Sequence, residues 1–511
     1  MEESKLDFLF KDLIEKINSS RYQFNALLHE EGRVTYVGTS VVKAIGLPKS
    51  FMGEILKVGE SSYAYVFGFK NNEIQLILLS KEANINIGDR VTRTGEGLSV
   101  PVSRSLLGRI IDPTGKSLDG RGDITTHNVK PLERIAPSVI ERVPVNKPLY
   151  TGIKVIDALI PIGKGQRELI VGDRQTGKTS ILLDTIINQK DKNVICIYVA
   201  IAQRASNVAS IIDILRTNDA LDHTIFVVSL ANDTPSIRYL APFSGSAIAE
   251  YFAEKGRDVL IVYDDLSKHA DSYRELSLLL KRPPGRDAYP SDIFYLHSRL
   301  LERAGNFSYN LGGGSITALP VVETQEGDIS QYIPTNLISI TDGQIYLERN
   351  LFNVGVRPAV NVGLSVSRVG SSAQSKAMKH VSKGLRLDLS QYMDLKAFTE
   401  FGAELKEETT IKLRKGELLT ELLKQKNSAP LSPEKEVLIF FAYSSSLLDD
   451  IPIEQIHYFE NELLDHISLK APQIFSTLIV SDEINEELSN AIKKVIEDFK
   501  YEFFAELEGE S

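Results

Sequence analysis

One segment near the middle of the chain constrains the fold more than any other feature. It reads GDRQTGKTS over residues 172–180 and matches the pattern G-x-x-x-x-G-K-[ST]. The two glycines allow the backbone to fold tightly, so that successive N–H groups point at one anion. A short apolar run before the segment and a helical apolar run after it predict a strand–loop–helix unit. The sequence therefore predicts a phosphate-binding loop that holds a nucleotide.

The residue types in this loop suit a nucleoside triphosphate and its metal ion. We expect Lys178 to reach the β- and γ-phosphates as a point charge, and the Thr179 hydroxyl to ligate Mg²⁺. Such a site also needs an acid at the end of a buried strand, and Asp264 ends the apolar run that begins at Val259. There, Asp264 would hold Mg²⁺ through a water molecule. The alternatives are a chance match of the loop and a turn-forming role for Asp264.

Binding a nucleotide does not by itself predict hydrolysis. A hydrolase needs a carboxylate to orient and polarise the attacking water, and it would follow the strand after the phosphate-loop helix. The polar residue at that position is Gln203. An amide cannot accept a proton, although it could order a water or contact Mg²⁺ weakly. Gln203 therefore predicts a site that binds a nucleotide without efficient turnover.

A third candidate lies in a run rich in small residues over 356–374, which contains Arg357 and Arg368. Arg368 could act as an arginine finger, which stabilises charge on a phosphoryl group bound to a neighbouring subunit. The alternative is a solvated loop. Another segment, KRPPGRDAYPSD over 281–292, predicts either a stiff turn or a loop that faces a partner.

Composition limits the classes of protein. A chain of 511 residues is long enough for roughly three domains, and 42% hydrophobic with 25% charged residues is typical of a globular protein. No apolar run approaches the ~20 residues that span a bilayer, and the acidic, amphipathic N-terminus does not resemble a signal sequence. We expect a soluble intracellular chain that reaches a membrane only through partners. The net charge of −10 argues against nucleic acid as the main ligand.

The texture of the sequence predicts four regions. An amphipathic segment over 1–23 would pack on its own domain or dock to a partner. Short strands over 24–97 predict a small β-barrel or sandwich. Alternating strands and helices over 98–384 predict a parallel α/β domain, and periodic apolar residues over 385–511 predict a helical bundle. The strands expected in the α/β domain are 168–172, 194–200, 225–230, 259–264, 293–296, 315–320 and 337–340.

With these residues in view, the chain resembles the alpha subunits of F-type ATP synthases along most of its length. Five motifs carry the resemblance: GDRQTGKT at 172–179, IVYDDLSK at 261–268, RPPGRDAYP at 282–290, YIPTNLISITDGQ at 332–344 and PAVNVGLSVSRVG at 358–370. The resemblance implies a β-barrel, a central RecA-like P-loop domain and a C-terminal α-helical bundle. It also implies that ATP or ADP and Mg²⁺ are the ligands.

The resemblance implies roles for individual residues. Asp264 corresponds to the acid of the family's Mg²⁺ site, with Thr179 as the direct ligand, and Gln203 to the glutamine that marks its non-catalytic site. Arg368 corresponds to the arginine that enters the catalytic site of the adjacent beta subunit, and Ser339 to a supporting interface serine. Asn427 stands where the family usually has a second glutamine near the base. The nucleotide-binding residues implied are Gln175, Thr176, Gly177, Lys178, Thr179, Ser180, Gln203, Asp264, Arg357, Pro358 and Gln425.

The resemblance further implies a set of partners. They are a catalytic beta subunit in an alternating hexamer, a central gamma-like shaft and a peripheral stalk subunit, at the cytoplasmic face of a membrane. Two alternatives remain: an alpha-like subunit of a motor derived from ATP synthase, and a hexameric RecA-like nucleic-acid translocase. The second requires a basic, aromatic-lined channel, and the acidic balance of the chain argues against it.

Overall fold

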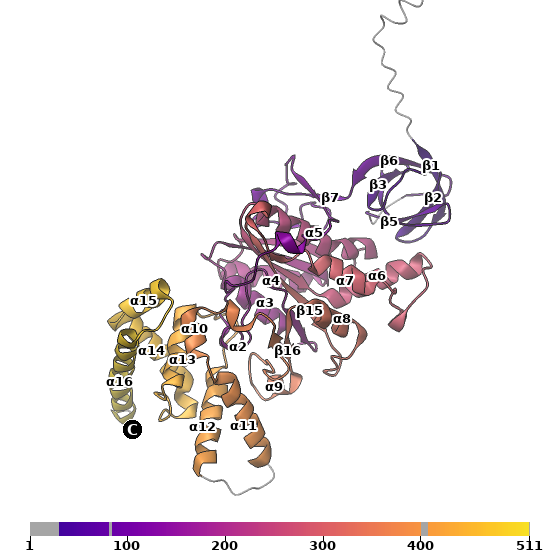
Figure 1. The fold of residues 1–511 in the computed structure, drawn as a ribbon. Coiled ribbons are helices and arrows are strands. Elements are labelled where there is room, and N and C mark those ends of the chain that lie inside the picture. Colours follow the sequence, from indigo (N-terminus) through magenta and orange to yellow (C-terminus); the bar gives the residue numbers. More distant parts are fainter. Residues whose placement is uncertain (1–29, 81–83, 400–406, 510–511) are drawn as a thin grey trace, which may run out of the picture.

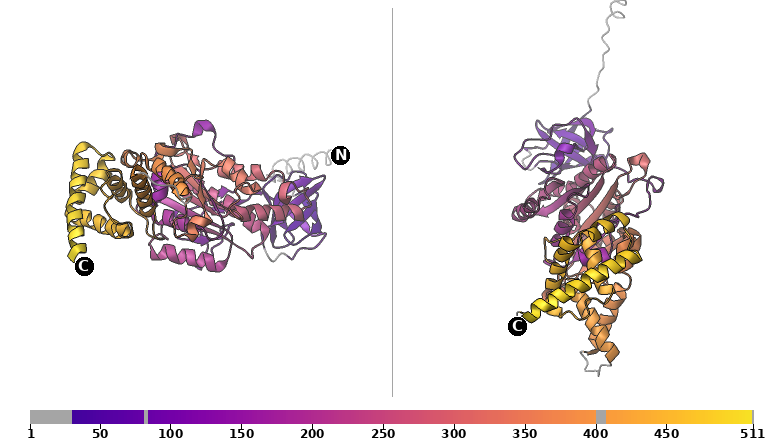
Figure 2. Two further views of the ribbon diagram at one scale, coloured as in Figure 1. Left: turned by 90° about the horizontal axis from the view of Figure 1, so that it is seen from below. Right: turned by 90° about the vertical axis from the view of Figure 1, so that its left-hand side faces the viewer.

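The computed structural model describes residues 30–80, 84–399 and 407–509. It shows a β-barrel at one end, a helical domain at the other end and an α/β domain between them (Figures 1 and 2). This order confirms the predicted fold class. The amphipathic segment predicted over 1–23 lies outside the described residues, and the exact domain boundaries stay predictions.

Six antiparallel strands close the barrel in the order β1-β2-β5-β4-β3-β6, which decides between the barrel and the sandwich. Leu56, Val66 and Leu76 belong to a separate apolar core inside it. The loop over 281–292 helps to join the barrel to the next domain, because the Arg282 guanidinium donates to the Phe67 carbonyl over 2.9 Å. The strands are β1 (Glu31–Val37), β2 (Val41–Ile45), β3 (Glu54–Val58), β4 (Ser62–Lys70), β5 (Glu73–Leu78) and β6 (Arg90–Gly97).

The central domain is built on a sheet in the order β17-β16-β10-β15-β13-β11-β12-β8, with β14 paired to β15. The strands from β16 to β8 run parallel, so their carboxyl ends meet at one edge. A separate pair is formed by β7 (Ser99–Pro101) and β9 (Val129–Pro131). The sheet strands are β8 (Ile110–Ile111), β10 (Leu169–Gly172), β11 (Val194–Gln203), β12 (Thr224–Leu230), β13 (Asp258–Asp264), β14 (Gly305–Asn306), β15 (Ser315–Glu323), β16 (Gly343–Leu347) and β17 (Val366–Ser367).

Helices cover both faces of this sheet, because its central strands are apolar on both sides. In β11, Cys196 and Tyr198 pack into one apolar core, whereas Ile195 and Ile197 pack into another. The buried thiol of Cys196 agrees with the strand expected there. The helices of the domain are α2 (Lys154–Leu159), α3 (Lys178–Ile187), α4 (Ala205–Thr217), α5 (Pro235–Ala253), α6 (Leu266–Leu279), α7 (Ile293–Leu301), α8 (Tyr332–Ile340) and α9 (Arg349–Asn353).

Two of the expected strands are wrong. Residues 293–296 open α7, and residues 337–340 close α8. The buried positions of α7 are Ile293, Leu296, His297, Leu300 and Leu301, and this spacing is that of one helix face. A four-residue window is too short to distinguish this period from that of a strand.

The C-terminal domain is helical, as predicted, and it shares an apolar core with one face of the sheet. The same core holds Ile186 of the phosphate-loop helix and Phe503 near the end of the chain. No helix of the described part of the chain is long and apolar enough to cross a membrane. The helices are α10 (Lys376–Val381), α11 (Leu385–Thr399), α12 (Glu407–Leu422), α13 (Pro433–Ser444), α14 (Ile456–Lys470), α15 (Gln473–Ser481) and α16 (Glu486–Gly509).

Candidate nucleotide-binding site

The phosphate loop connects β10 to α3 at the carboxyl edge of the sheet. Gly177 precedes α3 with a φ of 98°, a conformation that favours glycine. A Cβ atom on Gly172 would lie 2.6 Å from the Leu347 carbonyl oxygen, so a side chain does not fit there either. The loop is anchored by Asp173, whose Oδ1 accepts from the Thr324 hydroxyl at 2.7 Å and from the Gly327 N–H at 2.9 Å.

Lys178 is buried in this loop, and its Nζ donates to the carbonyl oxygens of Gly172 (2.8 Å) and Asp173. Burial lowers the pKa of the Lys178 ammonium, while the carboxylates of Glu323 and Asp265 act to raise it. A cation in such a poorly hydrated place interacts more strongly with an anion than it would in water.

Two acids lie at the end of β13 beside the loop: Asp264 is its last residue, and Asp265 follows it. Asp264 is buried, and its Oδ2 accepts from the Tyr198 hydroxyl at 2.5 Å. Burial raises the pKa of the Asp264 carboxyl, and the hydrogen bond from Tyr198 opposes this shift. Burial also raises the pKa of Asp265 to about 6. Asp265 caps α6: its Oδ1 accepts from the Lys268 N–H at 2.9 Å, and its Oδ2 lies 3.1 Å from the Lys268 ammonium.

The oxygen donors at this edge suit Mg²⁺ rather than a softer metal ion. Thr179 offers a hydroxyl and Asp264 a carboxylate, and Mg²⁺ is commonly held by one or two such groups together with phosphate oxygens and water. Within residues 30–80, 84–399 and 407–509, no group of three or more His, Cys, Asp or Glu side chains could hold a metal ion by itself. The donor set therefore fits a metal ion that arrives with a phosphorylated ligand.

Gln203 is the last residue of β11 and is only 8% exposed. Its Nε2 donates to the main-chain oxygen of Asp264 over 3.2 Å. The structure thus brings the glutamine that was singled out in the sequence next to the acid that ends the neighbouring strand.

A narrow pocket of about 30 Å³ continues from the phosphate loop towards the C-terminal domain. It brings together residues that lie far apart in the sequence and were expected to share one nucleotide. Among those that line it are Thr176, Gly177, Ser180, Arg357, Pro358, Gln425 and Asn427.

Two side chains shape the wall of this pocket. The Arg357 guanidinium lies 4.4 Å from the centre of the Phe352 ring, an arrangement that favours a cation. Gln425 has its amide engaged by the main chain, because Nε2 donates to Gly152 O (2.7 Å) and Oε1 accepts from Lys154 N–H (3.0 Å). The predicted contact between Gln425 and the base stays a prediction.

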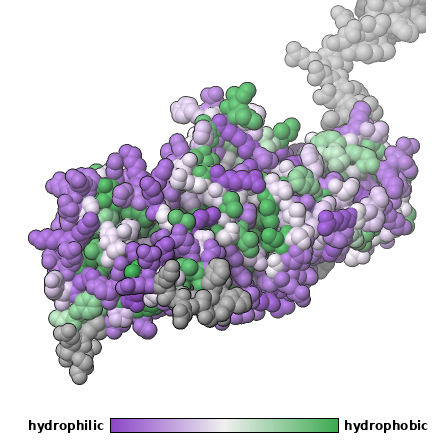
Figure 3. All heavy atoms as spheres, turned by 60° about the horizontal axis from the view of Figure 1, so that its bottom comes forward, coloured by the Kyte–Doolittle hydropathy of each residue, from purple (hydrophilic) through white to green (hydrophobic). Residues whose placement is uncertain are grey.

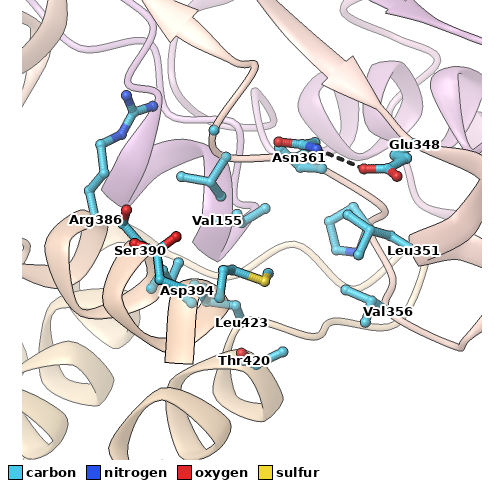
Figure 4. A pocket seen from close by; sticks show the side chains of 16 residues that line it. Val155, Glu348, Leu351, Val356, Asn361, Arg386, Ser390, Asp394, Thr420 and Leu423 are labelled. Atoms are coloured by element: carbon cyan, nitrogen blue, oxygen red, sulfur yellow. Dashed lines mark hydrogen bonds between the residues drawn. The ribbon is translucent and has the colours of Figure 1, made fainter. Parts of the chain in front are cut away.

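A larger pocket of about 690 Å³ lies beside it and shares Pro358 with it. Its lining is mostly apolar, and it lies between the central domain and helices α11 and α12 (Figure 4). Glu348 and Asn361 are joined on its wall by a hydrogen bond of 2.7 Å. No phosphate-loop residue lines this pocket, so the narrow pocket is the candidate nucleotide site despite its size.

Arg368 lies elsewhere. It directly follows β17, which is one edge strand of the sheet, whereas β8 is the other edge strand. The Arg368 side chain is exposed. Its N–H donates to the Asp342 carbonyl over 2.8 Å, and its guanidinium makes no ion pair with the described residues. Ser339 is exposed on α8 and donates to the Thr335 carbonyl at 3.0 Å. The structure therefore separates Arg368 from the phosphate loop of its own chain.

Sequence reasoning missed three residues that support the site: Asp173, Tyr198 and Glu323. Glu323 ends β15 and pairs in register with Gly172, and its carboxylate lies 3.0 Å from the Arg174 guanidinium. The rule that polar residues follow parallel strands could have found Glu323. The contact of Tyr198 with Asp264 depends on strand order, which the local sequence does not reveal.

The sheet order and the loop between β10 and α3 define a P-loop nucleotide-binding protein of the α/β class. The family description "ATP synthase alpha/beta family, nucleotide-binding domain" matches residues 152–367, and "ATP synthase alpha/beta chain, C terminal domain" matches residues 374–499. The chain belongs to the ATP synthase alpha/beta family, and within it to the alpha subunits.

Curated relatives cover nearly the whole chain. The ATP synthase subunit alpha of Petrotoga mobilis is 50% identical over 502 residues, which are 97% of this chain and 99% of the relative. The Aquifex aeolicus subunit alpha is 49% identical over 482 residues, 94% and 96% of the two chains. The Clostridium kluyveri subunit alpha is 49% identical over 491 residues, 96% and 97% of the two chains.

Proposed function

We propose that this chain is a non-catalytic, nucleotide-binding subunit of a rotary F-type ATP synthase, in which it binds Mg-ATP or Mg-ADP and gives Arg368 to an adjacent catalytic beta subunit. The observation that carries the proposal is Gln203 at the end of β11, with its amide on the Asp264 carbonyl. The position from which a carboxylate would activate water holds a group that cannot accept a proton.

The other acids near the loop do not replace that carboxylate. Asp264 accepts from Tyr198, Asp265 pairs with Lys268, and Glu323 pairs with Arg174. In the proposed function, the loop N–H groups and Lys178 hold the phosphates, while Thr179 and Asp264 hold Mg²⁺, which supplies charge neutralisation. Gln175, Thr176 and Ser180 complete the cradle, and Arg357, Pro358 and Gln425 form the wall near the base.

Arg368 is the residue that we assign to catalysis, in trans. Its guanidinium is exposed on an edge hairpin and forms no ion pair with the described residues, which leaves it available to a neighbouring subunit. An arginine in such a position stabilises the charge of a phosphoryl group during transfer.

Exposed apolar residues support an assembly of several subunits. Ile135, Val139, Ile140 and Tyr309 are each between 88% and 92% exposed, and the two segments meet where the Ser308 N–H donates to the Glu141 carbonyl at 2.8 Å. Figure 3 shows one face of the molecule, which is largely hydrophilic with separate hydrophobic patches. Apolar patches of this kind mark protein interfaces. The partners would be the beta subunits of an alternating hexamer, a central shaft and a peripheral stalk, at the cytoplasmic face of an ion-transporting membrane complex.

The test is the variant Arg368→Ala in the complex reconstituted with its catalytic partner. We expect kcat for ATP hydrolysis to fall by roughly 10³-fold or more, with assembly unchanged, because a trans-acting arginine stabilises the transferring phosphoryl group. The matched control is Arg216→Ala, which removes an exposed arginine on α4 and should leave kcat unchanged. Normal turnover of an intact Arg368→Ala complex would contradict the proposal.

A further inference from the structure

The hairpin that carries Arg368 rests on three consecutive residues that precede β10. Gln166, Arg167 and Glu168 lead directly into Leu169, the first residue of β10, which ends at the phosphate loop. The hairpin is formed by β16 and β17, where Gly343 pairs with Ser367. Gln166 and Glu168 are fully buried. None of the three residues lines the narrow nucleotide pocket.

Gln166 binds the hairpin through Ser367, the residue before Arg368. Its Oε1 accepts from the Gly163 N–H at 2.8 Å, which fixes the orientation of the amide. Its Nε2 then donates to Ser367 Oγ (3.1 Å) and to Glu168 Oε2 (2.7 Å). Ser367 Oγ in turn donates to the Pro161 carbonyl at 2.7 Å. Every hydrogen-bonding group of this buried set except Glu168 Oε1 has a partner among the described residues.

Arg167 holds the other strand of the hairpin. Its guanidinium Nε and NH2 groups lie 2.9 and 2.7 Å from the two oxygens of the Asp342 carboxylate. The Asp342 carbonyl accepts the N–H of Arg368 itself. A bidentate pair of this kind fixes geometry as well as adding energy, so one residue separates Arg167 from the main chain of Arg368.

Glu168 fills the space under the hairpin. A Cβ atom on Gly343 would lie 2.6 Å from Glu168 Oε2 and 2.1 Å from the Val366 carbonyl oxygen. The hairpin therefore sits directly on the Glu168 carboxyl and has no room to move closer. Burial raises the pKa of Glu168 well above its ordinary value, and the positive charge of Arg368 acts in the opposite direction.

We propose that Gln166, with Glu168 beside it, positions Arg368 for its action on the neighbouring subunit; the inference rests on the proposed function of Arg368. Gln166 does not line the narrow nucleotide pocket, and it holds the hairpin through Ser367 and through Glu168. A displacement of about 1 Å in a catalytic group can cost about 10²-fold in rate, so a loosened hairpin lowers turnover even though Arg368 is present.

The test is a double-mutant cycle in the reconstituted complex. Gln166→Leu keeps much of the side-chain volume but removes both donors, and we expect kcat to fall by about ten- to a hundred-fold with KM unchanged. In the Arg368→Ala background the same substitution should cause no further loss, because the group that it positions is gone. An equal loss in both backgrounds would show a merely structural role and overturn the inference.

Two further variants keep the result interpretable. Ser367→Ala removes the same hydrogen bond with a smaller change and should show the same dependence on Arg368; additive losses would overturn the inference. Gln189→Leu is the matched control, since Gln189 is also buried and donates to two carbonyls, but away from the hairpin. Its effect should be equal in both backgrounds. Normal turnover of Arg368→Ala alone would instead contradict the proposed function, so the two failures are distinguishable.

Discussion

Glu436 is a buried acid that the nucleotide site does not use. It lies in the first turn of α13 with no exposed surface, and no N–H or hydroxyl group of the described residues donates to its two oxygens, while the Asp157 carboxyl lies beside it. Burial and the nearby Asp157 carboxylate raise the pKa of Glu436 well above its ordinary value of 4.5, whereas the charges of Lys154 and Lys192 oppose them. Between pH 4.5 and the raised folded-state pKa, the folded chain therefore holds more of this proton than the unfolded chain does.

This predicts a pH-dependent gain in stability for Glu436→Gln. Because the folded-state pKa is raised, the stability from this carboxyl is fully present below pH 4.5 and is lost as the pH rises through the folded-state pKa. Between pH 4.5 and the folded-state pKa, the free energy of unfolding of the wild type should fall by about 1.4 kcal/mol per pH unit relative to that of the variant. Thermal midpoints measured between pH 5 and 8 would check it, with exposed Glu487→Gln as the control. A pH-independent difference would contradict the prediction.

At the scale of residues, the sequence predicted the side chains that a short local motif is enough to identify. Lys178 and Thr179 stand at fixed spacing in one loop, and Asp264 follows an unmistakable buried strand. In the sequence Glu436 is one of several acids at the start of a helix, and only the tertiary structure, in which α13 packs against helices such as α10, makes it a buried one. Burial of this kind is a property of the tertiary structure.

At the scale of elements, α2 is tied to the C-terminal domain by a buried ion pair. All six residues of α2 are buried, and the Lys154 Nζ lies 2.7 Å from Glu460 Oε1 on α14. The Lys154 N–H also bonds Gln425, so the same residue supports the wall of the nucleotide pocket.

Removing one partner of this pair should destabilise the chain strongly. Lys154→Met leaves the Glu460 charge buried without its partner, and we expect a loss of about 3–5 kcal/mol in the free energy of unfolding. The double variant Lys154→Met with Glu460→Leu should recover most of that loss, because both charges are gone. Urea denaturation followed by circular dichroism would measure both variants. A double variant as unstable as the single one would disprove this account.

Elements were predicted best where their period extends over a long run. The strands around β10, β11 and β13 were found because each is a nearly continuous apolar run, and β15 was found although Ser315 and Thr317 interrupt its apolar residues. Residues 293–296 and 337–340 look the same over four residues, yet their neighbours continue them as helices α7 and α8. The short strand β16 was missed, since Gly343 and the polar Gln344 open it and its pairing with β10 is remote in sequence.

At the scale of the molecule, the interior of the barrel forms a core of its own, although Tyr65 and Phe67 on its outside join one core of the central domain. The C-terminal domain shares the other core of the central domain. Leu56 belongs to the barrel core, and Phe459 of α14 belongs to the same core as Ile186 of α3. The sequence predicted a barrel, an α/β domain and a helical domain, but a core shared between the last two could not be derived from local patterns.

Because the cores are separate, two cavity-forming variants should destabilise different parts of the chain. Leu56→Ala and Phe459→Ala should each cost about 2–5 kcal/mol in local stability. The first should increase hydrogen exchange only in the barrel strands, and the second in both the C-terminal helices and α3. Native-state hydrogen exchange with mass spectrometry would resolve the segments. Faster exchange in α3 for Leu56→Ala, or unchanged exchange there for Phe459→Ala, would contradict the prediction.

The shared core also sets an order of events on the ribosome. The barrel ends at Gly97 and can complete its interior while most of the chain is still unmade. The core around the phosphate-loop helix includes Phe503, so α3, which ends at Ile187, waits for roughly 320 further residues, or about 16–64 s at ordinary rates of synthesis. During that interval the C-terminal helices that pack against the apolar face of α3 are not yet made. We therefore expect a chaperone to protect the nascent chain most at this stage.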